Sequence, residues 1–245
     1  MSRAADLSIV IPAFNEAAYL PFYLPTVQAA MRHWEGRSRL CGEIIVVGNA
    51  STDATATVAE DLGVRVVHEP RRNIGCVRNT GATAAVTPFL YFVDADVALP
   101  LEAVDVAATL LRSGSCVGGA IPPRYTPRRL GARLLCSFWD WYRQRTGTAQ
   151  GVSQFCTADA FHELGGYRTD LFMSEDVEFF GRLRRLGQAR DRPVVIVDEL
   201  RVRPSTRRYD RWPTWRMVFW QNPITARVLM TSPRFWRHWY DTTVR

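Results

Sequence analysis

The first hundred residues alternate between short apolar runs and longer segments with helical spacing, and this alternation constrains the fold more than any other feature. Strands that are apolar at nearly every position are buried on both faces, which is typical of a parallel sheet covered by helices on both sides. Ligands of such sheets bind where the strands end. The apolar runs predict strands at residues 7–11, 43–47, 64–67 and 88–93, and the segments between them predict helices at 16–33, 51–63 and 75–86.

The pattern loosens after residue 100, but strands and helices still alternate. Further strands are expected at 115–121, 154–157 and 193–197, and further helices at 100–112, 128–145, 158–164 and 175–186. We find no internal repeat and no linker. The sequence therefore predicts an α/β fold with a mostly parallel central sheet flanked by helices. One domain would occupy residues 1–200, and residues 201–245 would form an extension packed on it or extending from it.

The basic residues are unevenly distributed along the chain. All 31 are arginine, and residues 1–200 hold 21 of them against 22 Asp and Glu, whereas residues 201–245 hold ten against two. Arginine with tryptophan indicates an anionic membrane surface, a phosphate-bearing ligand or nucleic acid, or else a tail that packs its aromatic rings and solvates its charges. Five of the eight tryptophans lie in the same tail: Trp212, Trp215, Trp220, Trp236 and Trp239.

Several classes of protein are disfavoured by composition and missing motifs. A hydrophobic fraction of 47% with 22% charged residues is ordinary for a globular protein. The five cysteines form no CxxC pair, so we expect neither a zinc ribbon nor a disulfide scaffold. The turn after the first strand, residues 12–16, contains no glycine, and no P-loop motif occurs. A Rossmann dinucleotide site and a P-loop nucleotide site are therefore not expected.

Two carboxylates follow the fourth predicted strand. Asp94 and Asp96 are two positions apart, so in an extended chain their side chains point to the same face. Such a pair either coordinates a hard divalent cation together with substrate phosphates and water, or is simply solvated at the start of a loop.

A second acidic group, Glu175 and Asp176, stands at the start of a predicted helix, shortly after Gly165, Gly166 and Tyr167. Acidic residues at a helix N-terminus are common because they complement the helix dipole. The functional interpretation is a carboxylate placed to accept a proton from a substrate.

Taken in order, these segments are more specific than any one of them. The chain reads SIVIPAFNE, EIIVVGNASTDAT, NIGCVRNTGA, FLYFVDAD, FHELGGY and SEDVEFFGRLRRLG. This series resembles the family 2 nucleotide-sugar glycosyltransferases over roughly residues 6–200. The resemblance implies the GT-A fold and an inverting transfer of a sugar from a nucleoside diphosphate to an acceptor hydroxyl or phosphate.

The resemblance also implies roles for individual residues. Asp94 and Asp96 would match the DxD pair that holds Mn²⁺ or Mg²⁺, and Asp176 would be the general base, with Glu175 beside it. The acceptor side would include Gly165, Gly166 and Tyr167. The donor nucleotide sugar would contact Pro12, Phe14, Glu16, Asn49, Arg78 and Asp94.

One position departs from the family pattern. Members usually carry Asp-Asp after the second strand, and the second aspartate accepts a hydrogen bond from the base; here the pair is Gly48-Asn49. An asparagine can accept through its oxygen but can also donate. Uridine is the first expectation for the base and guanosine the second.

The tail bears on the acceptor. Residues 208–212 resemble the family's QxxRW motif, with arginine in the glutamine position, although an Arg- and Trp-rich tail can also produce this pattern by chance. Arg207 and Arg208 could contact phosphates, and Arg211 and Trp212 complete the motif. We expect a glycan or lipid-linked acceptor from glycan or cell-envelope biosynthesis and no nucleic-acid partner.

With neither a signal peptide nor an apolar run long enough to span a bilayer, the expected location is cytoplasmic, with peripheral contact to an anionic membrane on its inner face. Two other functions stay open. A sugar-nucleotide pyrophosphorylase is one, although its usual glycine-rich loop is absent. A non-catalytic nucleotide-sugar-binding protein on the same fold is the other.

Overall fold

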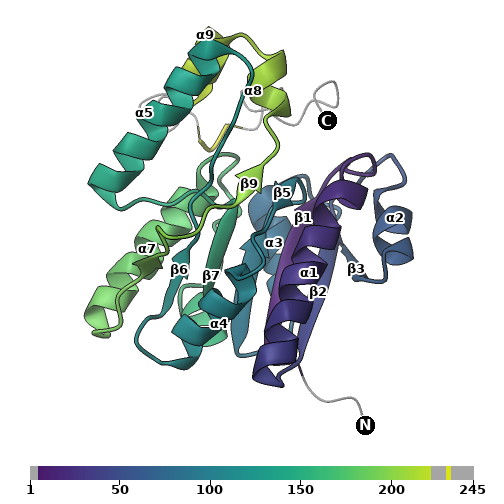
Figure 1. Ribbon diagram of the computed structural model, residues 1–245, viewed down its shortest axis with the longest axis vertical. Helices are drawn as coiled ribbons and strands as arrows, with labels where there is room; N and C mark the ends of the chain where they lie inside the picture. The colour runs from purple at the N-terminus through teal and green to yellow at the C-terminus, as the bar shows by residue number, and fades with distance from the viewer. Residues whose placement is uncertain (1–4, 222–229, 233–245) are drawn as a thin grey trace.

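A seven-stranded sheet with the order β3-β2-β1-β4-β7-β6-β8 runs through the computed structural model, which describes residues 5–221 and 230–232 (Figure 1). β7 is antiparallel to both its neighbours, whereas the other pairs are parallel. The predicted α/β class with a mostly parallel sheet is confirmed. The strands are β1 (Leu7–Ala13), β2 (Gly42–Gly48), β3 (Arg65–His68), β4 (Phe89–Val93), β6 (Gly118–Ala120), β7 (Ser153–Thr157) and β8 (Val195–Ile196).

The central strands are buried on both faces, as their continuous apolar runs predict. In β1, Ile9 and Ile11 join the core on one face, whereas Val10 joins the core on the other. This division follows from the two-residue period of a strand, which sends successive side chains to opposite faces. A strand wedged between two cores has no polar face, and this explains why the pattern lacks polar alternation.

Helices cover both faces of the sheet. One core includes side chains of α1 (Leu20–Ser38), α2 (Thr55–Asp61) and α4 (Ala103–Arg112). The other includes side chains of α3 (Ile74–Ala84), α6 (Ala158–Glu163) and α7 (Glu175–Ala189). Helix α3 approaches the sheet closely at Gly81, where an added Cβ would lie 2.3 Å from Val10. Only glycine therefore fits at that contact.

Several element boundaries differ from the sequence prediction, among them the start of α1 and the lengths of β6 and β8. Residues 16–19 form a turn, in which Tyr19 and Leu20 both donate to the Glu16 carbonyl, so α1 begins four residues late. Pro21 then occupies the first turn of the helix, where its missing N–H costs nothing. The strands expected at 115–121 and 193–197 shorten to β6 and β8, because Val117 bonds to Arg192 and Thr157 outside the regular ladder.

A second, two-stranded sheet was not predicted. β5 (Val97–Ala98) pairs antiparallel with β9 (Arg203–Pro204), so the chain just after residue 200 lies beside the segment that follows β4. Two-residue strands are too short to show a period in the sequence. This pairing brings the start of the 201–245 extension to the carboxyl edge of the large sheet.

Three helices stand together above that edge, at the top of Figure 1, and we call them the cap: α5 (Leu130–Thr146), α8 (Arg207–Arg211) and α9 (Thr214–Gln221). Their shared core contains Ala132, Tyr209, Trp212 and Met217. The chain leaves β6 for α5 after Ala120 and re-enters the sheet at Ser153. The next residue, Gln154, is the ladder partner of Ala120. Among the described residues, no helix is both long enough and apolar enough to cross a bilayer.

Candidate functional site

A cavity of about 1100 Å³ opens between the carboxyl ends of β1 and β4 and the cap. The chain supplies its walls from segments far apart in the sequence, because strand ends, the start of α7 and the cap all meet here. Of the residues singled out in the sequence, those that line it are Pro12, Phe14, Glu16, Arg78, Asp94, Asp96, Glu175, Asp176, Arg207 and Arg208.

Arg78 lies at the centre of the charge arrangement. It projects from α3, is buried, and donates to Glu175 at 2.6 Å and to Asp94 at 2.9 Å. Its guanidinium also lies 5.2 Å from the centre of the Tyr167 ring. Burial by itself would lower the pKa of Arg78, but the surrounding carboxylates raise it above its ordinary value. Arg78 therefore joins the two acidic groups that the sequence places eighty residues apart.

Glu175 and Asp94 are both affected by burial. Desolvation, reinforced by the neighbouring Asp176 charge, raises the pKa of Glu175 to about 7 despite the opposing effect of Arg78. Desolvation also raises the pKa of Asp94, again opposed by Arg78. A carboxyl group that ionises only near neutral pH can hold or release a proton under ordinary conditions.

Asp176 stands beside Glu175 but in a different environment. It occupies the first turn of α7, is half-buried, and lines the cavity. One of its carboxylate oxygens accepts from the Gly151 backbone N–H at 2.5 Å, and the other accepts from the Val177 N–H at 2.8 Å. These bonds fix the carboxylate at the cavity wall, in a position to accept a proton from a molecule in the cavity.

The cap contributes a second charge bridge. Arg207 of α8 donates to both oxygens of Glu16, at 2.8 and 2.5 Å, and lies 3.2 Å from an Asp96 oxygen. Its guanidinium also lies 4.1 Å from the centre of the Tyr19 ring. The carboxylates raise the pKa of Arg207 against the cost of burial. Arg207 thus ties the cap to the ends of β1 and β4.

Asn49 is not among the residues that line the cavity. It is buried at the end of β2, and its amide nitrogen donates to the carbonyl oxygens of Glu69 at 2.9 Å and Arg71 at 2.6 Å. An aspartate has no N–H to donate, so the family's usual residue could not make these two bonds. The departure at this position is therefore supported by its surroundings.

The three predicted acceptor-side residues do not line the cavity. Tyr167 is buried, with its ring packed against Phe92 and Phe179 beneath Arg78. Gly165 and Gly166 both have positive φ, and an added Cβ on Gly166 would lie 2.6 Å from the Asn79 side chain. The structure gives these residues a place behind the cavity wall.

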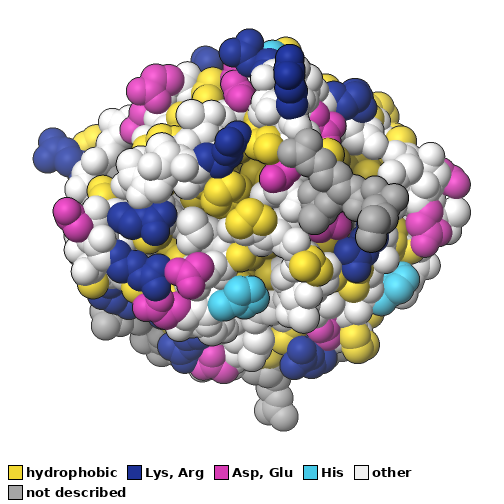
Figure 2. Space-filling model, turned by 90° about the horizontal axis from the view of Figure 1, so that it is seen from below, with side chains coloured by type: hydrophobic (Ala, Val, Ile, Leu, Met, Phe, Trp, Pro, Cys, Tyr) yellow, Lys and Arg dark blue, Asp and Glu magenta, His cyan; other side chains and the backbone are white. Residues whose placement is uncertain are grey.

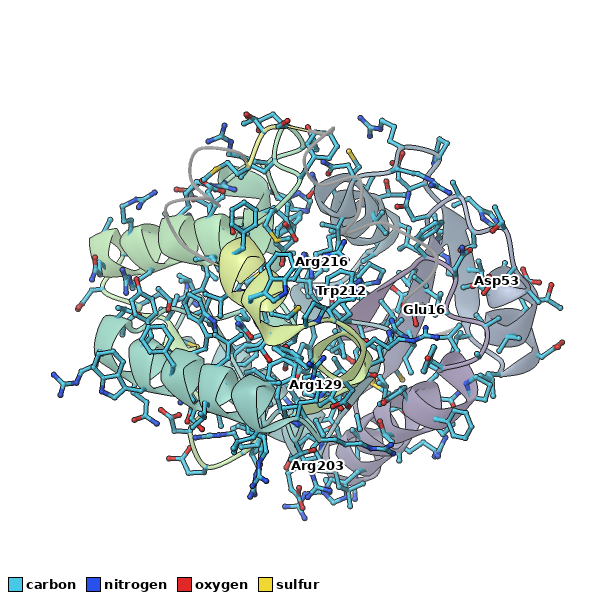
Figure 3. The ribbon with its side chains drawn as sticks, turned by 90° about the horizontal axis from the view of Figure 1, so that it is seen from above. Glu16, Asp53, Arg129, Arg203, Trp212 and Arg216 are labelled. Atoms are coloured by element: carbon cyan, nitrogen blue, oxygen red, sulfur yellow. The ribbon has the colours of Figure 1, made fainter. Side chains whose placement is uncertain are left out.

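Of the remaining tail residues, some line the cavity and others do not. Arg208 lines the cavity, and burial lowers its pKa. Trp212 is buried in the cap core, whereas Arg211 is exposed and outside the lining. Figure 3 shows Trp212 between Arg129 and Arg216, where α5 meets α9. The tail residues Trp220, Trp236 and Trp239 lie outside the side chains that the structure describes.

Sequence reasoning named no residue in the part of the lining that comes from the loop before α5 and from α5 itself. Arg143 is buried in this wall and is held by Asp140 and Asp198, both at 3.0 Å. The available signal was the density of arginine and aromatic residues from 124 to 145. Among the missed residues that line the cavity are Tyr125, Arg133, Asp140, Tyr142 and Arg143.

Comparison with known proteins identifies the family of this site. A family model described as "Glycosyl transferase family 2" matches residues 8–174, more than half of the chain. The chain belongs to glycosyl transferase family 2.

This family 2 chain is also similar to individual curated proteins. It is 39% identical over 90 residues to an uncharacterized glycosyltransferase of Mycobacterium tuberculosis. The match covers 37% of this chain and 36% of the relative, so the chain matches only about a third of that relative's length. An uncharacterized glycosyltransferase of Bacillus subtilis is 30% identical over 95 residues, which cover 37% of this chain and 26% of the relative.

Solved structures place the family 2 chain in the GT-A fold. A mannosyltransferase from Pyrobaculum calidifontis, solved with GDP-Man and Mn²⁺, matches with a TM-score of 0.64 at 19% identity, covering 84% of this chain and 58% of that one. TarS of S. aureus, solved with UDP-GlcNAc, matches with a TM-score of 0.61 at 16% identity, covering 81% and 58%. At these identities the likeness shows the fold alone.

The carboxylates of the family 2 chain suit a divalent cation held jointly with a ligand. Asp94 and Asp96 both line the cavity, and each keeps about a quarter of its side chain exposed. Within the described ranges, no group of three or more His, Cys, Asp and Glu side chains is arranged to hold a metal ion. Mg²⁺ and Mn²⁺ accept one or two carboxylates when phosphates and water complete the coordination. The donor set therefore fits such an ion.

Proposed function

We propose that this chain is an inverting glycosyltransferase that moves a sugar from a nucleoside diphosphate sugar to an acceptor hydroxyl or lipid phosphate. The observation that carries the proposal is the single cavity that Asp94, Asp96 and Asp176 all line, with Arg78 and Glu175 joining the two acidic groups behind them. UDP is the first choice of donor and GDP the second.

The donor end of the cavity is assigned to the ends of β1 and β4. Pro12, Phe14 and Glu16 would contact the base and ribose. Asn49, buried and outside the lining, would support this end through its bonds to the Glu69 and Arg71 carbonyls. Asp94 and Asp96 would hold Mn²⁺ or Mg²⁺, which when bound neutralises charge on the departing diphosphate. Arg78 fixes the carboxylate of Asp94, and this role follows from its 2.9 Å bond.

At the other acidic group, Asp176 is the proposed general base. Its carboxylate is held by two backbone N–H groups at the cavity wall. It would remove the proton of the acceptor hydroxyl, and the acceptor oxygen would then attack the anomeric carbon opposite the diphosphate. Glu175, paired with Arg78, would keep the helix start in place. A phosphate acceptor is already ionised and would need orientation rather than proton removal.

The acceptor would enter on the cap side. Arg208 lines the cavity there, and arginine matches phosphate geometry with paired donors. Arg207, bound to Glu16 and 3.2 Å from an Asp96 oxygen, would face phosphate at the donor end instead. Arg211 and Trp212 would act by supporting the cap. A lipid-linked acceptor fits a chain acting at the cytoplasmic face of a membrane in glycan or cell-envelope biosynthesis.

Donor binding and turnover test the proposal together. Calorimetry with UDP and GDP, with and without Mn²⁺, should show tight binding only with the metal, and Asp96→Ala should abolish that dependence. Asp61→Ala, an exposed carboxylate on α2, is the matched control and should bind like the wild type. Slow hydrolysis of the matching nucleotide sugar should accompany binding.

The alternatives give different results. A pyrophosphorylase would release pyrophosphate from a nucleoside triphosphate and a sugar phosphate. A binding protein would hold the donor without hydrolysing it. Binding of UDP and GDP that is equal with and without metal, in wild type and Asp96→Ala alike, would contradict the metal assignment.

A further inference from the structure

Helix α5 carries a stripe of large apolar side chains that the cap core does not cover. Leu130, Leu134, Phe138 and Trp141 are each between 50% and 69% exposed. Their spacing of four, four and three residues puts them along one side of an α-helix, over about 16 Å at 1.5 Å per residue. Because these side chains are exposed, packing within the fold does not explain why they are apolar.

Helix α9 extends this apolar surface. Trp215 is 71% exposed, and Val218 and Phe219 are each 46% exposed, whereas Met217 points into the cap core. The two helices touch closely, since an added Cβ on Gly131 would lie 2.8 Å from the Thr214 hydroxyl. Figure 1 shows α5 and α9 together at the top of the molecule, above the strands of the sheet. We call the seven exposed side chains of the two helices the outer face of the cap.

The charges around the outer face are almost all positive. The segments 122–147 and 207–221 hold ten arginines and two acidic residues, Asp140 and Asp210. Five of these arginines line the cavity, which leaves five outside it: Arg128, Arg129, Arg145, Arg211 and Arg216. Asp140 is bound to Arg143, and Asp210 accepts from the Arg128 backbone and the Thr206 hydroxyl. Arg145 extends over the Trp141 ring, at 5.6 Å. By contrast, basic and acidic side chains are interspersed on the face opposite the cap (Figure 2).

We propose that the outer face of the cap docks on an anionic lipid bilayer without spanning it. Exposed aromatic and aliphatic side chains enter the boundary between headgroups and acyl chains, and arginines bind the negative headgroups. A water-exposed apolar stripe with a surrounding of arginines matches that surface in both chemistry and charge. The docking residues belong to α5 as well as to the basic tail.

The docking geometry bears on the substrate, and this step rests on the proposed function. A different side of α5 lines the cavity through Arg133, Asp140 and Arg143. A bilayer on the outer face would therefore lie about one helix diameter, roughly 10 Å, from the cavity. An acceptor anchored in the bilayer by a lipid chain could present its polar end to the cavity without leaving the membrane.

Co-sedimentation with vesicles tests the docking. The wild-type chain should pellet with vesicles of equal parts phosphatidylcholine and phosphatidylglycerol at low salt, be released at high salt, and ignore pure phosphatidylcholine. The double variant Phe138→Gln, Trp141→Gln should bind on the order of tenfold more weakly, because two inserted rings are lost. Leu134→Gln is a milder second variant with a smaller effect in the same direction.

Phe22→Gln is the matched control, because Phe22 is 74% exposed and lies on α1, which is not part of the cap. It should bind vesicles like the wild type. If the double variant and the wild type bound vesicles equally well, the proposal would be overturned, because binding would then not depend on the outer face. A wild-type dimer in sedimentation velocity that the double variant loses, without vesicle binding, would instead assign the face to a second copy of the chain.

The experiments can disprove bilayer docking without disproving the glycosyltransferase activity, and the reverse. Neither Phe138 nor Trp141 lines the cavity, so the double variant should hydrolyse donor in the absence of lipid like the wild type. Asp176→Asn should bind vesicles normally, since Asp176 is not on the outer face. If the wild type hydrolysed no donor, the proposed function would fail, but the vesicle experiment would still test the docking.

Discussion

The parallel half of the sheet and the cap differ in where they keep their apolar residues. In β1, β2 and β4 nearly every apolar side chain is buried, and the charges gather at the strand ends. In the cap, the core is small, and large apolar side chains stand in water. Burial alone explains the sequence of the first region. In the second region, the exposed residues contribute little to folding, so their presence indicates contact with something outside the chain.

The largest effect is expected from a substitution at the edge of the sheet, where we assign the general base. Asp176→Asn keeps the shape of the side chain but removes the proton acceptor. Transfer to a hydroxyl acceptor should fall by about 10²–10⁴-fold, whereas donor affinity measured by calorimetry should stay the same. Asp61→Asn is the control and should be fully active. If Glu175→Gln lowers transfer more than Asp176→Asn does, the base has been assigned to the wrong member of the pair.

The second prediction concerns the stability of the sheet region. Arg78→Met leaves the buried Glu175 and the half-buried Asp94 without their shared cation, so the free energy of unfolding should fall by about 3–5 kcal/mol in urea titrations. Arg168→Met is the matched control. Its ion pair with Asp170 is about half exposed, so the loss should be within about 1 kcal/mol. Equal losses in the two variants would show that the buried bridge has no special role.

The third prediction separates the two regions directly. Trp212→Ala removes the largest side chain from the small cap core and should release the cap without unfolding the sheet. Limited proteolysis should then cut between residues 122 and 147 at least several-fold faster, whereas the main thermal transition should change little. A single transition shifted downward, with no new cleavage, would mean that cap and sheet unfold as one unit.

The smallest expected effect is a pH dependence. The pKa of Glu175 is raised from 4.5 to about 7, so between these values the folded state holds a proton that the unfolded state has lost. The contribution of Glu175 to stability should therefore decline as pH rises from about 4.5 to about 7. Urea titrations at about pH 5 and about pH 7.5 should show the wild type losing stability relative to Glu175→Gln. Parallel behaviour of the two would contradict the raised pKa.

Much of the sheet region was predictable because its signals are local. Continuous apolar runs identify β1, β2 and β4, and Asp94 and Asp96 follow the last of them directly. The contacts of Arg207 were not predictable in the same way, because its partner Glu16 is 191 residues away and no period links the two. The outer face of α5 was also missed, because the sequence alone does not tell which side of a helix a neighbouring core covers.

Asn49 shows another limit of prediction from the sequence. The sequence showed that this position departs from the family pattern, but not why the fold accepts the change. The reason lies in two backbone carbonyls, of Glu69 and Arg71, that the loop after β3 brings to its amide. Hydrogen-bond partners contributed by backbone carry no signature in the identity of the residues that supply them.

The pairing of Ala120 with Gln154 has a consequence for how such proteins diversify. The whole of α5 leaves and re-enters the sheet at two neighbouring ladder positions, and Ile121 donates to the Ser153 carbonyl at the base of the excursion. Residues 121–152 therefore behave geometrically as an exchangeable module on a constant frame. A relative could replace this segment by one of another length, and with it the surface that the protein presents, while the ends of β1 and β4 keep their places.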